Sequence, residues 1–209
     1  MSIATTCWKC ATQTGNDVAC HACGYFQPFP ETLDYFQVMR VPRRMKIDAD
    51  ALRARFYELS RKLHPDNFAA ATPDEVAIAT RNAAVLNQAY RTLREPLARA
   101  EYLLERLGGK ADAPPDPAFL MEMMEVGERI EDAAAADARA DLEHDLEDFR
   151  GRVRGKDQEL EAIFADWDAL GEAPDAAART AIADQLRTNL GVRKYYKNII
   201  RDITQTLGA

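Results

Sequence analysis

Apolar residues recur at helical spacing along most of the chain after residue 31. A first stripe has spacings of 4, 3 and 4 residues and consists of Leu52, Phe56, Leu59 and Leu63. A second stripe consists of Val76, Ala79, Ala83, Leu86, Tyr90 and Leu93. Side chains spaced in this way line one face of a helix. The two stripes predict an antiparallel pair of helices joined by a loop, with a shorter helical segment before them over 34–40.

The last third of the chain contains three further runs with helical periodicity, 119–132, 142–167 and 175–207. Two proline- and glycine-rich stretches, 27–30 and 108–117, interrupt the pattern, and such residues punctuate secondary structure. The pattern predicts a mainly α protein with three parts. These parts are a segment over 1–30, a helical domain over 31–108 and a three-helix bundle over 118–209.

Composition and charge narrow the class of protein. Of the 209 residues, 47% are hydrophobic and 29% are charged, and the net charge is −7. This is the composition of a globular protein. Its acidic balance argues against binding of nucleic acid or an anionic membrane by the whole chain. We find no apolar run of about 20 residues and no targeting signal at the start of the chain, so we expect a cytoplasmic protein.

All four cysteines lie within the first 23 residues, as the pairs Cys7-x-x-Cys10 and Cys20-x-x-Cys23. Four thiolates at this spacing can converge tetrahedrally on one metal ion. About thirty residues bury too little apolar surface to fold alone, and a bound ion would supply the missing stability. Zinc is the leading candidate, and a mononuclear iron site has the same ligands. Disulfides and a redox-active dithiol are the alternatives.

A second motif lies between the first two predicted helices. The helix over 51–63 carries a net charge of +3 and runs into His64-Pro65-Asp66. Proline ends the helix there and restricts the backbone. The bases of this helix are Arg53, Arg55, Arg61 and Lys62, against the single acid Glu58. As an ordinary end of a helix, the tripeptide would need no further explanation. That interpretation does not explain why a basic helix precedes it and a second helix with a matching apolar stripe follows it.

Together these residues resemble a J-domain. The resemblance rests on Asp34-Tyr35-Phe36, the break at Pro42, residues 57–63, His64-Pro65-Asp66 and Asn87-Gln88-Ala89-Tyr90-Arg91-Thr92-Leu93. Pro96-Leu97-Ala98-Arg99-Ala100-Glu101-Tyr102-Leu103-Leu104 and Phe119-Leu120-Met121-Glu122 narrow it to the HscB family, the J-type co-chaperones of iron–sulfur cluster biogenesis. This resemblance covers essentially the whole chain. The tetracysteine segment is similar to an extension found on some longer members.

The resemblance implies a non-enzymatic co-chaperone with two protein partners. The J-domain would engage a DnaK/HscA-class chaperone and stimulate its ATPase, with His64, Pro65 and Asp66 as the trigger. Docking on the chaperone would use Arg53, Arg55, Arg61 and Lys62. The C-terminal bundle would hold an IscU-type iron–sulfur scaffold. One departure is Asn67-Phe68 after the tripeptide, where many members have Lys-Phe.

The helix over 119–132 has two apolar faces when its residues are placed about 100° apart. Phe119, Met123, Val126 and Ile130 form one stripe, which suits packing into the bundle. The second face consists of Leu120, Met121, Met124, Glu125 and Glu128. A wide buried face is one interpretation; the other is a scaffold-binding surface, because apolar patches rimmed by charge mark interaction sites. The resemblance adds a last-helix contact, whose register among Val192, Tyr195 and Tyr196 the pattern leaves open.

Three rival functions follow from the same features. A J-domain protein could serve a different client. The tetracysteine segment could be a zinc-binding adaptor or a nucleic-acid module, although its single basic residue, Lys9, argues against phosphate binding. A dithiol oxidoreductase would need a reactive thiol pair. The oligomeric state stays open, a dimer formed through the N-terminal segment included.

Overall fold

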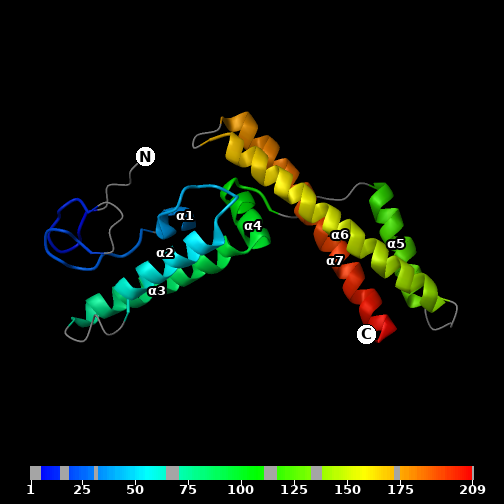
Figure 1. Cartoon of the computed structure of the whole chain (residues 1–209), viewed down its shortest axis with the longest axis horizontal. Coiled ribbons are helices and arrows are strands. Elements are labelled where there is room, and N and C mark those ends of the chain that lie inside the picture. Colours follow the sequence, from blue (N-terminus) through cyan, green and yellow to red (C-terminus); the bar gives the residue numbers. More distant parts are fainter. Residues whose placement is uncertain are drawn as a thin grey trace. The chain divides into compact units, whose positions relative to one another are not determined.

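The computed structural model describes residues 6–14, 19–30, 33–64, 71–110, 117–132, 138–171 and 175–208. The chain divides into two compact units, Met1–Arg99 and Ala100–Ala209 (Figure 1). Seven helices account for most of the described residues, which confirms the predicted mainly α class. The domain limits drawn from the sequence remain predictions. In the described part of the chain, no helix is both long and apolar enough to span a membrane.

The first unit contains a helical hairpin, as the apolar stripes predict. Its helices are α1 (Tyr35–Met39), α2 (Ala49–Lys62) and α3 (Pro73–Arg94), and α2 and α3 lie side by side in Figure 1. Side-chain caps at Asp34, Asp48 and Thr72 fix where the three helices begin. Each cap accepts hydrogen bonds from backbone amides of the first turn, which have no partner inside the helix.

The core of the first unit forms where the two predicted stripes meet. Leu52, Leu59, Leu86 and Leu93 are all buried. The ring of Phe56 stacks on that of Tyr90 with centroids 4.3 Å apart, which joins α2 to α3. Val76 departs from the prediction, since its side chain is exposed in the first turn of α3.

A fourth helix, α4 (Pro96–Arg106), follows α3 after a single residue, and the boundary between the two units falls within it. The pattern of apolar residues does not predict this helix as a separate element. Pro96 explains the break, because proline cannot donate the backbone hydrogen bond that would continue α3. Leu103 and Leu104 of α4 are buried in the second unit.

The second unit contains α5 (Pro117–Glu131), α6 (Ala138–Ala169) and α7 (Ala176–Leu207). The three helices form the predicted bundle, with α6 and α7 packed along each other and α5 against both (Figure 1). The core around α5 contains Val126, Leu142, Phe149, Val153, Tyr196 and Ile203. Gly151 and Gly155 lie inside α6 without interrupting it, because packing along a long apolar face outweighs their low helix propensity.

Candidate metal centre and partner-binding surfaces

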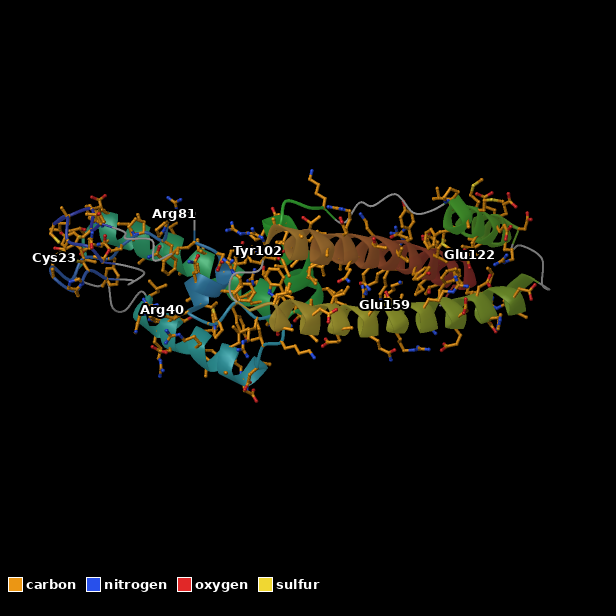
Figure 2. The ribbon with its side chains drawn as sticks, turned by 90° about the horizontal axis from the view of Figure 1, so that it is seen from above. Cys23, Arg40, Arg81, Tyr102, Glu122 and Glu159 are labelled. Carbon is orange, nitrogen blue, oxygen red and sulfur yellow. The ribbon has the colours of Figure 1, made fainter. Side chains whose placement is uncertain are left out.

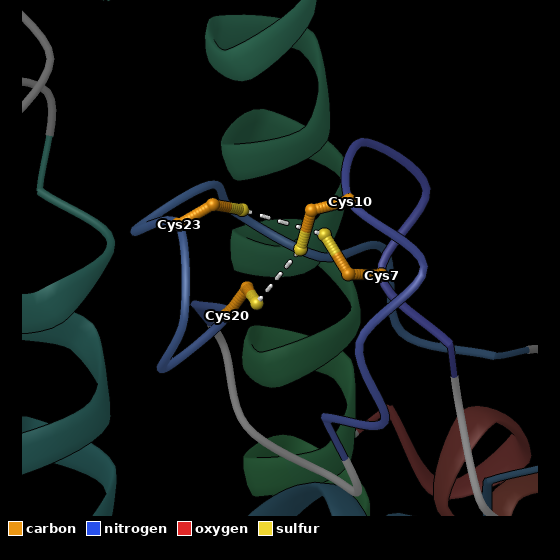
Figure 3. A group of neighbouring side chains, drawn as sticks. All are labelled: Cys7, Cys10, Cys20 and Cys23. Atoms are coloured by element: carbon orange, nitrogen blue, oxygen red, sulfur yellow. Dashed lines mark hydrogen bonds between the residues drawn. The ribbon is translucent and has the colours of Figure 1, made fainter.

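The four cysteine sulfurs converge on one point (Figure 3). Cys7 Sγ lies 3.6 Å from Cys23 Sγ, and Cys10 Sγ lies 3.6 Å from Cys20 Sγ. All four sulfurs lie within 4.8 Å of one another. Four ligands at a zinc–sulfur distance of about 2.3 Å would be separated by about 3.8 Å in a regular tetrahedron, whereas a disulfide needs about 2.05 Å. No disulfide joins these four cysteines in the structure, and their arrangement fits the predicted four-sulfur metal site better than a disulfide.

Two loops of matching conformation carry these sulfurs. The Ala11 amide donates to Cys7 O at 2.9 Å, and the Gly24 amide donates to Cys20 O at 2.8 Å, thirteen residues further along. The same offset relates the isolated bridges Thr6–Gln13 and Ala19–Phe26. Ala11 and Gly24 both have left-handed backbone conformations, with φ of 58° and 74°. The two Cys-x-x-Cys pairs are thus presented by one repeated turn, which points each pair inward.

Polar groups contact two of the four sulfurs, and the pKa values of the cysteines differ. The hydroxyl of Thr12 lies 3.3 Å from Cys10 Sγ, and hydrogen bonding by Thr12 lowers the pKa of Cys10 to about 6. The buried Gln27 side chain donates to Cys7 Sγ at 3.3 Å and to Tyr25 O at 2.7 Å. A hydrogen bond donated to sulfur stabilises thiolate, the form of cysteine that binds metals. Burial and hydrogen bonds with the other cysteines act in the opposite direction at Cys23 and raise its pKa to about 12.

A buried asparagine connects the cysteine segment to the helical hairpin. Asn82, in the middle of α3, is fully buried. Its Nδ2 donates to Gln27 O at 2.6 Å, and its Oδ1 accepts from the Phe29 amide at 2.9 Å. Gln27 therefore touches a metal-ligand sulfur through its side chain and α3 through its carbonyl. The cysteine segment and the hairpin form one continuous structure in the first unit.

The predicted chaperone-facing surface is only partly assembled in the described residues. His64 is exposed directly after the end of α2. Pro65 and Asp66 lie outside the described residues. Arg53, Arg61 and Lys62 are exposed, as docking groups require. Arg55 is half-buried instead, because its Nε donates to Met39 O at 3.3 Å.

The charges of α2 are largely paired along the helix itself. Arg53 Nη2 pairs with Asp50 Oδ1 at 2.8 Å. Arg55 pairs with Glu58, and Lys62 Nζ lies 3.4 Å from the same carboxylate. The hydrogen bond from Arg55, reinforced by Lys62, lowers the pKa of Glu58. The basic surface is therefore less positive than the sequence charge of the helix suggests.

Helix α5 uses its two faces differently. Phe119, Met123 and Ile130 pack against the core around Val126, which confirms the predicted inner stripe. On the other face the side chains of Leu120, Met121 and Met124 are 42%, 63% and 67% exposed. Glu125 and Glu128 are exposed beside them. The wide buried face is thus excluded, and α5 presents an outward patch of apolar side chains with an acidic rim.

Ion pairs and aromatic contacts set the orientation of α5. Glu122, labelled in Figure 2, accepts from Arg152 Nη1 of α6 at 2.5 Å. Arg129 Nε pairs with Asp145 Oδ2 at 3.0 Å. Both residues of α5 thereby face α6, which leaves the apolar patch on the side away from these contacts.

The structure also shows which of Val192, Tyr195 and Tyr196 reaches the surface beside α5. The ring of Tyr195 meets that of Phe119 edge-on, with centroids 5.6 Å apart, and is partly exposed. Tyr196 is buried between Phe119 and Phe149, and Val192 packs partly against the core. Of the three candidates, Tyr195 is the one available at the surface.

The sequence pattern does not identify Gln27 or Asn82 as residues that link the four cysteines to α3. Polar residues are common both in helices and after Cys-x-x-Cys pairs, so the neighbouring sequence does not distinguish these two. The one available signal is that Asn82 falls among the apolar positions of α3, where a buried amide needs partners.

Comparisons with known proteins agree with this architecture. Residues 34–102 match the DnaJ domain, and residues 115–204 match the family described as HSCB C-terminal oligomerisation domain. A J-domain combined with this helical domain defines the chain as a J-domain co-chaperone.

Curated relatives identify the family. The iron-sulfur cluster co-chaperone protein HscB of Mus musculus is 34% identical over 167 residues, which span 76% of this chain and 68% of that protein. A co-chaperone protein HscB homolog of Photobacterium profundum is 34% identical over 165 residues, which span 74% and 93%. The chain belongs to the HscB co-chaperone family.

Solved structures of the same family share the fold. The crystal structure of human co-chaperone protein HscB superposes with a TM-score of 0.68 at 24% identity, covering 96% of this chain and 98% of that one. Chaperone HscB from Vibrio cholerae gives a TM-score of 0.56 at 32% identity, covering 83% and 96%.

The left-handed conformation of Ala11 leads to a first prediction. The left-handed conformation costs a residue with a Cβ atom roughly 1–2 kcal/mol, whereas glycine adopts it without this cost. We expect Ala11→Gly to tighten metal binding by about fivefold, because metal binding and folding of this segment are coupled. Competition with a chromogenic zinc chelator measures the change. The matched variant Gly24→Ala, at the equivalent position of the second loop, should weaken binding, and equal behaviour of the two variants would contradict the argument.

The Asn82 contacts lead to a second prediction. Asn82→Ala removes the partners of two backbone groups, and each buried unsatisfied group costs about 1–3 kcal/mol. We expect the free energy of unfolding of the metal-loaded protein to fall by about 2–4 kcal/mol in a urea titration. Asn87→Ala is the control, since Asn87 is exposed on the same helix and its Nδ2 contacts only Ala83 O. A loss for Asn87→Ala as large as that for Asn82→Ala would count against the anchoring role.

Proposed function

We propose that this protein is a co-chaperone of iron–sulfur cluster assembly that delivers an IscU-type scaffold to a DnaK/HscA-class chaperone. It acts by binding its two partners and stimulates the chaperone's ATPase, without being an enzyme itself. The observation that carries the proposal is the outward apolar patch of α5, since a bundle that served only as a support would have no use for it. Membership of the HscB family and the name of the mouse relative support the cluster-assembly role.

Support for the chaperone partner comes from the end of α2. His64 is exposed where the hairpin turns, next to the basic surface of Arg53, Arg61 and Lys62. We propose that His64, Pro65 and Asp66 contact one conformation of the chaperone better than the other and so shift its population. Charges on α2, including Arg55 if its present contacts are exchanged, would speed and orient the encounter more than they add affinity.

Support for the scaffold partner comes from α5 and α7. The proposed contact consists of Leu120, Met121, Met124, Glu125 and Glu128, to which the surface position of Tyr195 adds an aromatic ring. Apolar groups at the centre and carboxylates at the rim are the usual arrangement of an interface. Methionine side chains suit a partner surface that is itself adaptable.

We further propose that Cys7, Cys10, Cys20 and Cys23 hold a structural zinc ion, with mononuclear iron as the less favoured metal. Closed sites with four cysteine ligands are typical of structural zinc. Bound zinc would contribute about 10–16 kcal/mol to folding of a segment this small. The hydrogen bond between Asn82 and Gln27 O would couple that stability to α3.

The proposal as a whole is tested by the rate at which a DnaK/HscA-class chaperone hydrolyses ATP. The rate is measured with this protein alone, with an IscU-type scaffold alone, and with both. We expect synergy, so that both proteins together increase the rate of ATP hydrolysis by more than the sum of their separate effects. Stimulation without synergy would favour a J-domain protein that serves a different client.

A third prediction concerns His64. We expect His64→Gln to lower stimulation of the chaperone by about tenfold or more, the effect of losing one state-specific contact of roughly 1.4 kcal/mol. Single-turnover ATP hydrolysis measures it, and circular dichroism checks that the helices are retained. His144→Gln replaces another exposed histidine, on α6, and should stimulate normally. Unchanged stimulation by the His64 variant would refute the trigger role.

A fourth prediction concerns the acidic rim of the patch. Reversing both charges with Glu125→Lys and Glu128→Lys should weaken scaffold binding by about tenfold, mainly through slower association that depends on salt. Surface plasmon resonance at two ionic strengths measures both rates. The control reverses two exposed acids of α6, with Glu161→Lys and Asp166→Lys. If both pairs of substitutions weaken binding equally, net charge rather than this rim would be responsible.

A further inference from the structure

The methionines that the structure describes differ sharply in how far their side chains are exposed to solvent. Met39 and Met45 are fully buried in the first unit. Met123 packs partly against the core of the second unit. Met121 and Met124, by contrast, are the most exposed of the described large apolar side chains. Among the described methionines, the two with the most exposed side chains therefore both lie on the outward patch of α5.

Exposed methionine reacts with peroxides by a defined two-electron step. A lone pair of the thioether sulfur attacks one oxygen of hydrogen peroxide, the O–O bond breaks, and water leaves after proton transfer. The sulfur is oxidised to the sulfoxide and the peroxide is reduced. Methionine sulfoxide reductases of two kinds, one for each epimer, reverse the step with electrons from a thiol reductant.

Oxidation would change the chemistry of the patch without touching the packing of α5. The sulfoxide is polar and accepts hydrogen bonds, so it loses the preference of the thioether for an apolar contact. Helix α5 is held by Phe119, Met123, Val126 and Ile130 on its opposite face, and by the pairs of Glu122 and Arg129 with α6. Those contacts do not involve the two exposed sulfurs, so the fold would survive.

We propose that Met121 and Met124 form a reversible redox switch, in which oxidation of their sulfurs releases the iron–sulfur scaffold. The inference rests on the proposed scaffold-binding function and adds its regulation. Delivery of the scaffold would thereby pause while peroxide is present. The step needs no neighbouring catalytic group, and the exposure of both side chains gives peroxide access to them.

The test starts with the full-length metal-loaded protein and a purified IscU-type scaffold. The protein is treated with hydrogen peroxide, and mass spectrometry of its peptides follows sulfoxide at each methionine. Isothermal titration calorimetry then measures scaffold binding before treatment, after treatment, and after incubation with both sulfoxide reductases and dithiothreitol. We expect sulfoxide first at Met121 and Met124, scaffold affinity about tenfold lower or more, and recovery after reduction.

The variant Met121→Leu with Met124→Leu provides the decisive control. Leucine keeps the apolar volume of methionine but has no sulfur to oxidise, so the affinity of each protein for the scaffold after peroxide is compared with its own affinity before treatment. The variant retains all four cysteines and should keep its affinity after peroxide. A loss of binding in this variant as large as in the original protein would overturn the switch, since the cysteines or other groups would then be responsible.

Two further outcomes separate the switch from the function on which it rests. Unchanged binding by protein carrying sulfoxide at both positions would overturn the switch alone. Failure of the untreated protein to bind the scaffold would overturn the proposed scaffold function, and the switch with it.

Discussion

Each helix of this protein can bury only part of its circumference, and that limit governs what remains for partners. In the second unit, α6 and α7 pack along each other and α5 packs against both. Helix α5 contributes one stripe to the core, with Phe119, Val126 and Ile130. The remaining apolar side chains of α5 therefore have no place inside the bundle. An exposed patch of this kind lowers solubility unless something covers it, so its presence calls for a functional explanation.

The cysteine segment is limited by its small number of apolar residues. It contains too few apolar residues to form a core, and the four sulfurs occupy the place that a core would have. The hydrogen bonds from Gln27 and Asn82 then extend order from those sulfurs to α3, where α1 and α2 also pack. The four-cysteine group is consequently joined to the hairpin through a few buried polar contacts.

Much of this arrangement could be predicted from the sequence, because it follows from local spacing. The cysteine pairs indicate a metal centre on their own, and the stripes of α2 and α5 identify the faces that pack. What could not be predicted depends on contacts between distant residues. Asn82 lies 55 residues from its partner Gln27, so no local pattern joins them. Arg55 looks like its exposed neighbours in the sequence and is distinguished only by a backbone carbonyl that the fold brings near it.

The paired charges of α2 bear on how a helix that we propose to dock on a chaperone can be both stable and available. Exposed pairs such as that of Arg53 with Asp50 contribute little stability, typically about 0–1 kcal/mol. A partner that offers a better carboxylate can therefore take over the guanidinium at little cost. Arg55 is different, since its additional contact with Met39 O would be lost at the same time. We therefore expect Arg53, Arg61 and Lys62 to contribute more than Arg55 to the proposed docking. Position on the helix and charge alone do not distinguish Arg55 from the other three.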